Sequence, residues 1–444
     1  MSNKAVPSGS TIAAIATPPG RGGVGIIRIS GPDAISVISS LSTRKCNPEP
    51  RVATLDVWRD SNGQVLDQGI VLFFPGPASY TGEDVVELQG HGSTVLLHAL
   101  LARLFELGCV PAQPGEFTRR AVENGKMDLS QAEAVVACID AATVRACLQA
   151  QRQLQGAFGR HINELMVRLT SLVAHVEATL DFPEEEIPDL YFSDLRDKML
   201  LQVVEPVRVM LASAPLGERL FHGATVAIIG APNAGKSSLL NALSGRDRAI
   251  VSHIEGTTRD TLEVDFEVHG IPLRLVDTAG LRETDDLIEQ EGVRRARETA
   301  SNADVTLFVA DATRPHTWDE SVHADIFLMN KTDLQHGDVP EKYLQISVAA
   351  GIGLESLRTK LATYLGDMAM GDEGMMVTRE RHRVILTEAL EYIESGLLSL
   401  SDEEMLDVTA MQWRRAWALL GSILGIGDVD HILDRIFSEF CIGK

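Results

Sequence analysis

The pattern of hydrophobic and polar positions changes along the chain, and its first part predicts a mixed α+β domain. Over residues 1 to about 120, short β-type runs alternate with turns rich in glycine and proline. Such runs predict strands, and the sequence places them at Thr11–Ala16, Gly25–Ile29, Gln68–Phe74 and Val85–Leu88. The segment Ser93–Leu107 has the apolar spacing of an amphipathic helix.

The second pattern is helical. From Ala121 to about Leu180, apolar residues recur at helical spacing, which predicts long helices. A proline-bounded acidic break at 183–188 is followed by a further predicted helix, at about Ser193–Ala212. Helical spacing returns from Thr378 to Phe440.

Between the two helical parts, apolar strand runs alternate with helices, which is typical of a parallel βαβ sheet. The runs are Ala224–Ile229, Leu273–Val276, Val305–Ala310 and Asp325–Met329. We therefore predict an α/β and α+β multidomain protein: an α+β domain (1–120), a helical domain in two parts (121–222 and 368–444), and an α/β unit (223–367) inserted into it. The connection over 311–324 has only about fourteen residues, close to the minimum of a parallel crossover, so its helix should be short or irregular.

Composition narrows the class of protein. The longest apolar stretches of the 444-residue chain are interrupted, and we expect no membrane span, no secretory leader and a cytoplasmic protein. The net charge of −22 argues against broad binding to nucleic acid, although residues 1–60 carry seven basic against four acidic side chains. The five cysteines form no metal or disulfide spacing, and we expect all but Cys441 to be buried thiols.

A phosphate-binding loop follows the first strand of the α/β unit. Gly230-Ala-Pro-Asn-Ala-Gly235-Lys236-Ser237 matches G-x-x-x-x-G-K-[ST] between a predicted strand and a predicted helix, the context that the motif requires. Glycines let backbone N–H groups converge on phosphate, and the helix start adds positive potential. Lys236 should reach the β- and γ-phosphates, and the Ser237 hydroxyl should bind Mg²⁺.

Two further motifs predict guanine-nucleotide binding. Asp277-Thr-Ala-Gly280 closes a predicted strand 40 residues after Ser237, where Asp277 can support Mg²⁺ through water. Asn330-Lys-Thr-Asp333 ends another strand. The Asp333 carboxylate suits the two adjacent donors of guanine, whereas adenine presents an acceptor at that edge. Ser347-Val-Ala349 stands where GTPases usually read Ser-Ala-Lys, and its valine keeps the backbone N–H.

The residue that orients water in hydrolysis is not the usual one, because Leu281 rather than glutamine follows Gly280. Asn233 is one candidate: its amide oxygen could hold a monovalent cation beside the phosphates, or it could only stabilise the turn. Glu289 is the other, either orienting water or lying solvated on a helix face.

These residues bring the chain close to a known family. The segments Gly230–Ser238, Ser252–Asp260, 277–283 and 330–333 closely resemble the TrmE-type GTPases, which have a Ras-like P-loop G domain. The resemblance extends over essentially the full chain, through Thr17–Arg28, Tyr80–Gly92, Pro114–Phe117, Asn124–Lys126, Gln131–Glu133 and the Cys-x-Gly-Lys ending at 441–444.

The resemblance implies a K⁺-dependent GTPase that forms a homodimer and acts with a FAD-containing partner, MnmG, in a heterotetramer. Together they would install an aminomethyl or carboxymethylaminomethyl group at carbon 5 of the wobble uridine in certain tRNAs. The one-carbon donor would be a tetrahydrofolate derivative (5-formyl- or methylene-tetrahydrofolate), bound by an N-terminal domain that also dimerises.

Site residues follow from the same resemblance. Folate would contact Arg28, Glu87, Lys126 and Lys444, since cations suit its carboxylate tail and a carboxylate suits the pterin. Mg²⁺ would be held by Ser237 and Thr258, and K⁺ by Asn233, Ser252, Ile254 and Thr257. Catalytic residues would be Lys236 and the water-orienting Glu289. The expected nucleotide contacts are Asn233, Ala234, Gly235, Lys236, Ser237, Ser238, Ser252, His253, Ile254, Glu255, Gly256, Thr257, Thr258, Asp277, Thr278, Ala279, Gly280, Asn330, Lys331, Asp333, Ser347, Val348 and Ala349.

Cys441 has two readings. A thiol beside an ammonium, here that of Lys444, gains thiolate character, which would suit a catalytic role; the alternative is a thiol that only positions or packs the tail. Three departures from the family pattern are the less acidic stretch Gly425–His431, Ser252 in place of threonine, and the short connection 311–324.

A different function class also stays open. A ribosome-assembly or regulatory GTPase would share the nucleotide motifs and lack one-carbon chemistry. Such proteins usually carry a basic RNA-binding domain after the G domain, whereas residues 378–444 here are acidic and helical.

Overall fold

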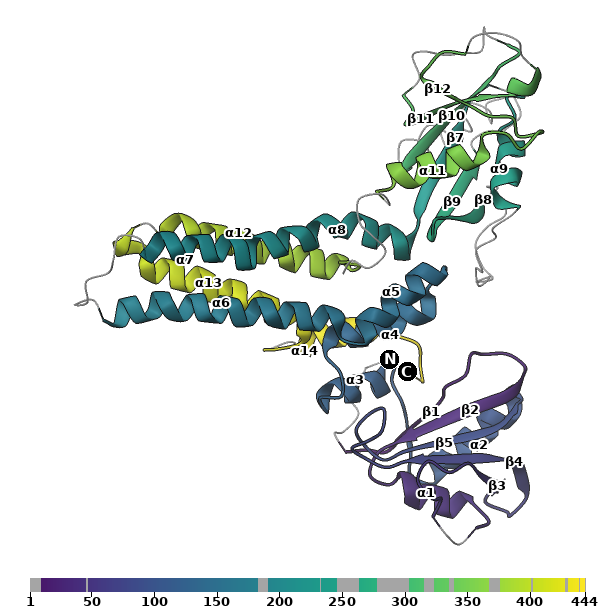
Figure 1. The fold of residues 1–444 in the computed structure, drawn as a ribbon. Helices are drawn as coiled ribbons and strands as arrows, with labels where there is room; N and C mark the ends of the chain where they lie inside the picture. Colours follow the sequence, from purple (N-terminus) through teal and green to yellow (C-terminus); the bar gives the residue numbers. More distant parts are fainter. Residues whose placement is uncertain are drawn as a thin grey trace, which may run out of the picture. The chain divides into compact units, whose positions relative to one another are not determined.

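The computed structural model describes residues 9–44, 47–182, 191–231, 233–245, 263–277, 303–314, 323–334, 339–366, 376–400, 402–427, 430–438 and 440–443. These residues divide into two compact units, one of 1–136 with 421–444 and one of 137–420 (Figure 1). The ends of the sequence therefore belong to one unit, and the whole α/β part belongs to the other.

The first unit contains a six-stranded sheet in the order β3-β4-β5-β2-β1-β6. Its strands are β1 (Ile12–Ile15), β2 (Gly22–Ser30), β3 (Thr54–Arg59), β4 (Val65–Phe74), β5 (Val85–Gly92) and β6 (Val110–Pro111). All pairs are antiparallel except β1 with β6. The helices α1 (Ala34–Leu41) and α2 (Thr94–Glu106) cover the sheet, and Ile27, Leu88 and Leu100 are fully buried between these layers. The α+β prediction is confirmed, while α1 and β3 were missed.

The C-terminal residues pack inside this first unit. Helix α3 (Glu116–Glu123) and the first part of α4 (Leu129–Asp140) contact α14 (Asp430–Ser438). Phe437 and Phe440 are buried against Leu129 and Ala132, with their own rings 5.0 Å apart. Because these C-terminal rings are buried against α4, the cluster holds the last residues of the chain within the first unit.

The second unit contains a bundle of long helices. They are α5 (Val144–Leu154), α6 (Ala157–Asp181), α7 (Tyr191–Met199), the π-helical turn Leu200–Val204, α8 (Glu205–His222), α12 (Glu380–Ser399) and most of α13 (Leu406–Leu424). The predicted helical run 121–180 is thus divided into four helices, α3 to α6, and the helix predicted at 193–212 extends to His222. The extension passes Pro215, which lacks the N–H of a regular helical hydrogen bond, and Ser213 and Leu216 beside it are buried.

Helix Tyr191–His222, including its π turn, is long and apolar enough by length and composition to cross a membrane, with a mean hydropathy of 1.3. A core helix of a soluble protein passes the same test, and 44% of the apolar window is buried within the protein. Val203, Val204 and Val207 are completely buried, and α8 packs against α12. The segment is therefore weak evidence for a membrane.

The α/β part has a second six-stranded sheet, in the order β12-β11-β10-β7-β9-β8. Its strands are β7 (Ala224–Ile229), β8 (Glu263–Val268), β9 (Ile271–Asp277), β10 (Val305–Asp311), β11 (Ile326–Asn330) and β12 (Tyr343–Gln345). All neighbours are parallel except the edge strand β8. Helices α9 (Lys236–Ser244) and α11 (Leu354–Tyr364) complete the described part. The predicted parallel sheet is confirmed, and β8 and β12 are additions to it.

The expectation for the cysteines was wrong in part. Cys109 is buried, but Cys138 is only half-buried and Cys147 is exposed, while Cys46 lies outside the described residues. Helical periodicity assigns a residue to a face, and here the neighbouring helices do not cover the faces that carry these two thiols. Most of the short connection 311–324 also lies outside the described residues.

Candidate nucleotide site and tail site

The phosphate-binding loop joins β7 to α9, as its sequence predicts. Gly230 has a φ of +144° and Gly235 a φ of +96°, both in the region that favours glycine. A Cβ atom at Gly235 would lie 2.2 Å from the side-chain nitrogen of Asn330. Glycine is therefore required for the loop to pass under the guanine motif.

Lys236 is folded over this loop. Its buried side chain donates hydrogen bonds to the carbonyl oxygens of Gly230 (2.7 Å) and Ala231 (2.8 Å). The ammonium thus lies above the curve of the loop, with Ser237 one residue further along α9. A lysine held at this place supplies positive charge where a polyphosphate would lie, so the local donor set fits a nucleotide.

The guanine motif is tied to the phosphate loop by two side chains. The Asn330 amide nitrogen donates to the Ala234 carbonyl (2.9 Å), and its oxygen accepts from the Val348 N–H (3.2 Å). Lys331 donates to the Asn233 carbonyl (2.8 Å) and to Asp311 (2.6 Å). The phosphate loop, the end of β10, the guanine motif and the loop at Val348 therefore meet at one edge of the sheet.

Asp333, the predicted selector of the base, is exposed to solvent at this edge. One of its oxygens accepts a hydrogen bond from the Ser347 hydroxyl (2.5 Å), which fixes the carboxylate, and the other oxygen has no hydrogen-bond partner among the described residues. Ser347 is itself buried, and its backbone pairs with Ile352. The loop that reads Ser-Val-Ala thus orients Asp333 through serine, while Val348 donates its N–H to Asn330 and packs its side chain against the apolar core.

Asp311 is a part of this site that the sequence analysis missed. It ends β10, is buried, and pairs with Lys331. Burial by itself would raise the pKa of Asp311, but hydrogen bonds from Lys331 and Thr313 outweigh that effect and hold the pKa below its ordinary value. The sequence does carry a signal for Asp311. It is an acidic residue at the end of an apolar strand, and that strand lies beside the one that carries the guanine motif.

The remaining nucleotide and metal candidates are only partly described. The structure gives the backbone of Asp277 at the end of β9 and the left-handed φ of Asn233 (+63°). Ser252, His253, Ile254, Glu255, Gly256, Thr257, Thr258, Thr278, Ala279, Gly280 and Glu289 lie outside the described residues. The roles of this group stay predictions.

A second candidate site lies in the first unit, around Arg28. The Arg28 guanidinium donates to Glu87 from two nitrogens (3.1 and 3.0 Å) and to the Gly443 carbonyl from a third (3.4 Å). Its carbon lies 5.5 Å from the ring centre of Tyr80 and 5.8 Å from that of Phe117. A charged pair walled by aromatic rings and a backbone carbonyl suits a planar, polar heterocycle.

The C-terminal tail is docked at this site. Gly443 has a φ of +99°, and a Cβ atom there would lie 2.3 Å from the Ile15 carbonyl, so glycine permits the close approach of the tail to β1. The Cys441 carbonyl accepts from the Gly115 N–H (3.4 Å), and Cys441 is exposed. Arg28, Glu87 and the tail are thus brought together, while Lys444 lies outside the described residues.

Lys126 is placed beside the same loop as Tyr80. Its ammonium donates to the Pro77 carbonyl (2.9 Å), and its stem packs at Gly82. Burial raises the pKa of Tyr80, against opposing effects of its hydrogen bond with Thr118 and of the Arg28 charge. In the sequence, Tyr80 and Phe117 belong to the motif segments Tyr80–Gly92 and Pro114–Phe117, and no periodicity indicates that their rings flank Arg28.

A buried ionic network holds that loop in place. Arg120 binds Glu83 (3.0 Å) and Glu116 (2.8 Å), and Ser30 donates to Glu83 (2.6 Å). Because Glu83 lies three residues after Tyr80, the network fixes the segment that carries the aromatic ring. A buried ion pair is stable only when its charged atoms are hydrogen-bonded, and Arg120 and Glu83 meet that condition here.

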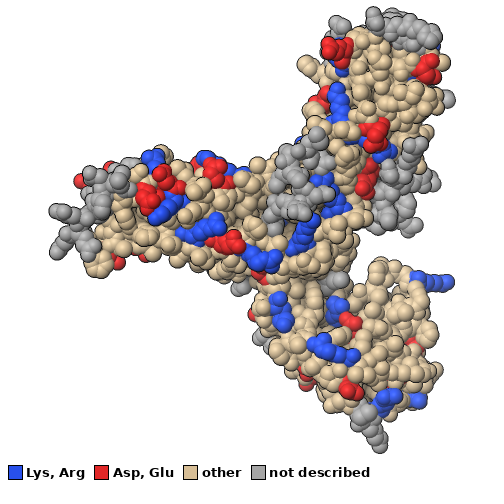
Figure 2. Space-filling model, in the orientation of Figure 1, with Lys and Arg blue, Asp and Glu red and all other residues tan. Residues whose placement is uncertain are grey.

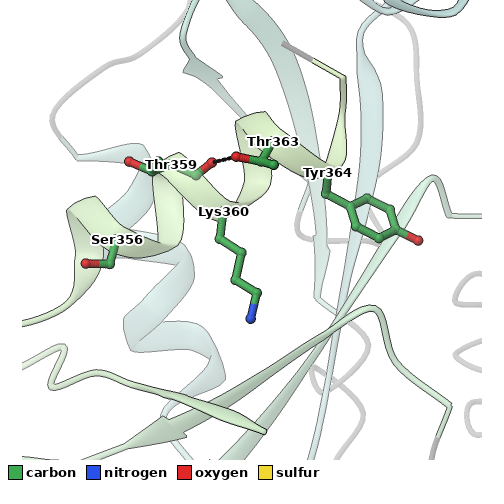
Figure 3. Close-up of a pocket in the computed structure, with 5 residues that line it drawn as sticks. All are labelled: Ser356, Thr359, Lys360, Thr363 and Tyr364. Carbon is green, nitrogen blue, oxygen red and sulfur yellow. Dashed lines mark hydrogen bonds between the residues drawn. The ribbon is translucent and has the colours of Figure 1, made fainter. Parts of the chain in front are cut away.

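A surface hollow of about 510 Å³ lies elsewhere, on α11 (Figure 3). Its lining residues are Ser356, Thr359, Lys360, Thr363 and Tyr364, all from one helix. None of them belongs to the nucleotide motifs or to the Arg28 site.

Two family models match the chain: the MnmE helical domain over residues 129–441 and the GTP-binding protein TrmE N-terminus over residues 11–126. Proteins named tRNA modification GTPase MnmE are similar over nearly the whole length. That of Acinetobacter baumannii (strain AYE) is 43% identical, covering 98% of this chain and 99% of its own. That of Hydrogenovibrio crunogenus is 44% identical, covering 98% of both chains.

The chain belongs to the MnmE family of tRNA modification GTPases. This agrees with the resemblance to TrmE-type GTPases and with the order of an N-terminal domain, a helical domain and a G domain. Among solved structures, the G domain of the T. maritima FeoB iron transporter is 28% identical, covering 32% of this chain and 98% of that chain, with a TM-score of 0.25. Family membership rests on the MnmE relatives and the two family models.

Proposed function

We propose that this chain is a K⁺-dependent GTPase that acts with the FAD-containing partner MnmG on the wobble uridine of certain tRNAs. The complex would add an aminomethyl or carboxymethylaminomethyl group at carbon 5, with a tetrahydrofolate derivative as one-carbon donor. Support comes from membership of the MnmE family and from the placing of Arg28, Glu87 and the tail in one site.

The proposed GTPase site combines the phosphate loop, the guanine motif and two metal ions. Lys236 and the phosphate loop bind the polyphosphate, Ser237 and Thr258 hold Mg²⁺, and Asp333 selects guanine. K⁺ would be held by Asn233 together with Ser252, Ile254 and Thr257, and would supply charge neutralisation in the transition state. Glu289 would orient the attacking water. The left-handed backbone of Asn233, whose carbonyl is anchored by Lys331, supports a defined position for its side chain.

The folate site is proposed around Arg28, Glu87, Lys126 and Lys444, with Tyr80 and Phe117 as aromatic walls. Because Arg28 and Glu87 are paired, a bound pterin would share Glu87 with the guanidinium rather than meet a free carboxylate. Cys441 is exposed two residues before Gly443, and its proposed role is either that of a catalytic thiol or that of a thiol that only positions the tail.

We also propose an oligomeric state and a cellular location for the chain. The chain would form a homodimer through an N-terminal domain of residues 1–120 and a heterotetramer with MnmG, in the cytoplasm. The helical domain would comprise 121–222 and 368–444 around a G domain of 223–367. On the face drawn in Figure 2, basic and acidic side chains are interspersed, so we place the main tRNA contacts on a local patch or on the partner.

A folate titration tests the proposal against a regulatory GTPase. Arg28→Met should weaken binding of 5-formyl-tetrahydrofolate at least about tenfold, since it removes a charge-assisted contact. Arg59→Met is the matched control, because the Arg59 side chain donates to the carbonyl of Gly63 in the same domain and to no other group among the residues that the structure describes. Nucleoside analysis of tRNA treated with the chain and its flavoprotein partner completes the test. Absence of both folate binding and modified uridine would favour the regulatory GTPase.

A further inference from the structure

The turn between β8 and β9 is held by the helix α5. His269 and Gly270 form this turn with φ of +51° and +82°, the left-handed conformation of a tight hairpin. The Thr143 hydroxyl donates to the Gly270 carbonyl (2.7 Å), and the Arg145 guanidinium donates to the His269 carbonyl (2.9 Å). Both turn carbonyls are therefore bound by side chains from the start of α5.

The contact is packed as well as hydrogen-bonded. Thr143 is buried, and the same hydroxyl accepts from the Ala146 N–H as the N-cap of α5. A Cβ atom at Gly270 would lie 2.6 Å from the Arg145 Cβ, so the arginine stem rests directly on the glycine. Ala146 shares one buried apolar cluster with Phe266 of β8 and Leu273 of β9.

Helix α8 packs against the same hairpin. Leu216 and Leu220 belong to the apolar cluster that contains Phe266 and Leu273, and α8 packs along β9. The hairpin is thus joined to two elements of the helical part through a close-packed interior, which transmits displacement rather than absorbing it.

The hairpin that α5 binds lies between two proposed nucleotide-binding segments in the sequence. Strand β8 begins at Glu263, shortly after the segment 252–260 that carries the proposed cation ligands. Strand β9 ends at Asp277, the first residue of the DTAG motif. A seven-residue strand spans about 23 Å at roughly 3.3 Å per residue. One paired hairpin therefore connects the ends of both motif-bearing segments in the sequence with α5.

We propose that Thr143 and Arg145 are positioning residues that couple the nucleotide state of the G domain to the helical domain through the turn His269–Gly270. Movement of the DTAG or cation-binding segment on hydrolysis displaces the hairpin, and the two hydrogen bonds carry that displacement into α5. The proposal rests on the GTPase function and needs neither folate nor the flavoprotein partner.

The test is hydrogen exchange of the α5 amides in the full chain, compared between GDP and GDP with aluminium fluoride in K⁺. The double variant Thr143→Val, Arg145→Met keeps side-chain shape and removes both donors. We expect the nucleotide-dependent difference in α5 to fall about fivefold or more, in the range of coupling factors between sites. Affinity for GDP should stay within about twofold, because the hydrogen bonds that the two residues donate go to the turn carbonyls of Gly270 and His269 rather than to a nucleotide motif.

Conservative and control variants make the result specific. Thr143→Ser with Arg145→Lys retains a donor at each position and should restore the difference in α5. Arg160→Met removes a similar bond from an arginine to a carbonyl, that of Gln155 (2.9 Å), at the opposite end of α5 from the hairpin, and should leave the nucleotide-dependent difference in α5 unchanged. Arg145→Met alone keeps the Thr143 N-cap of α5. It replaces the double variant in the test if the double variant has a much lower melting temperature than the wild type.

An α5 that responds to nucleotide equally in the wild type and in the donor-free variants would overturn the proposal. So would a wild-type α5 whose exchange is the same in both nucleotide states. Loss of folate binding or of tRNA modification leaves this readout unaffected, so the two proposals fail separately.

Discussion

The side-chain amide of Asn330 donates a hydrogen bond to the backbone carbonyl of Ala234, 96 residues earlier, over 2.9 Å. The guanine motif and the phosphate loop therefore form one structure rather than two adjacent ones. Asn330 is buried, and its other side-chain atom binds the N–H of Val348. Its role is to hold the two loops that a nucleotide would bridge.

Replacing Asn330 by alanine should weaken GDP and GTP about 10- to 100-fold, measured by calorimetric titration. Leaving buried groups such as the Ala234 carbonyl and the Val348 N–H unpaired costs about 1–3 kcal/mol, and each 1.4 kcal/mol is about tenfold in affinity. Thr359→Ala on the exposed face of α11 is a control for a substitution in the same domain. Unchanged affinity in Asn330→Ala would show that the loops keep their geometry without this bond.

Asp333→Asn should exchange guanine for xanthine specificity. The asparagine presents a donor in place of a carboxylate oxygen, which opposes the donor edge of guanine and suits the carbonyl of xanthine. Ser347 can still bond the remaining oxygen, so the loop should stay in place. Binding of GDP and xanthosine diphosphate is compared, and a retained preference for guanine would remove Asp333 as the selector.

Hydrolysis should slow strongly when K⁺ is replaced by Na⁺, because the proposed cation site uses the Asn233 amide oxygen. Asn233→Ala should hydrolyse GTP slowly in both salts, while its affinity for GDP changes little. Phosphate release under saturating GTP and Mg²⁺ is the measurement. Equal wild-type rates in the two salts would exclude a catalytic K⁺ and return Asn233 to a turn-stabilising role.

Stability should depend on the ionisation of Asp311. Because hydrogen bonds from Lys331 and Thr313 lower its pKa in the folded protein, ionised Asp311 stabilises the fold above the ordinary pKa of 3.8. That contribution is lost as the pH falls through the lowered folded pKa. Asp311→Asn should therefore lower the free energy of unfolding at pH 7 by about 1–3 kcal/mol, which is measured as a lower melting temperature than that of the wild type. The difference between the two proteins should narrow below about pH 4.

Asp304→Asn is the matched control for this titration. Asp304 precedes the same strand, is exposed, and accepts one backbone hydrogen bond, from Thr225 (2.8 Å). Its melting difference from the wild type should be small at pH 7. A gap for Asp311→Asn that is constant from pH 7 to pH 3 would mean that the Lys331 pair contributes no ionic stabilisation.

The sequence by itself determined the parts of this protein that depend on neighbouring residues. The P-loop glycines, the DTAG and guanine motifs and the alternation of strands and helices depend on local conformation and short spacing, so the parallel sheet and the family were predictable. The helical run 121–180 was recognised, but its divisions were not, since loops such as that at Thr143 are stabilised by contacts outside the run.

Only the tertiary structure decided which distant residues meet. Nothing in the spacing showed that Asp311 would pair with Lys331, that Tyr80 and Phe117 would flank Arg28, or that Gly443 would lie on β1. These contacts join residues at least 20 positions apart, and the bond from Arg28 to Gly443 spans 415 positions. They exist because burial of separate apolar faces brings their polar ends together, and that arrangement is a property of the packed chain rather than of any local pattern.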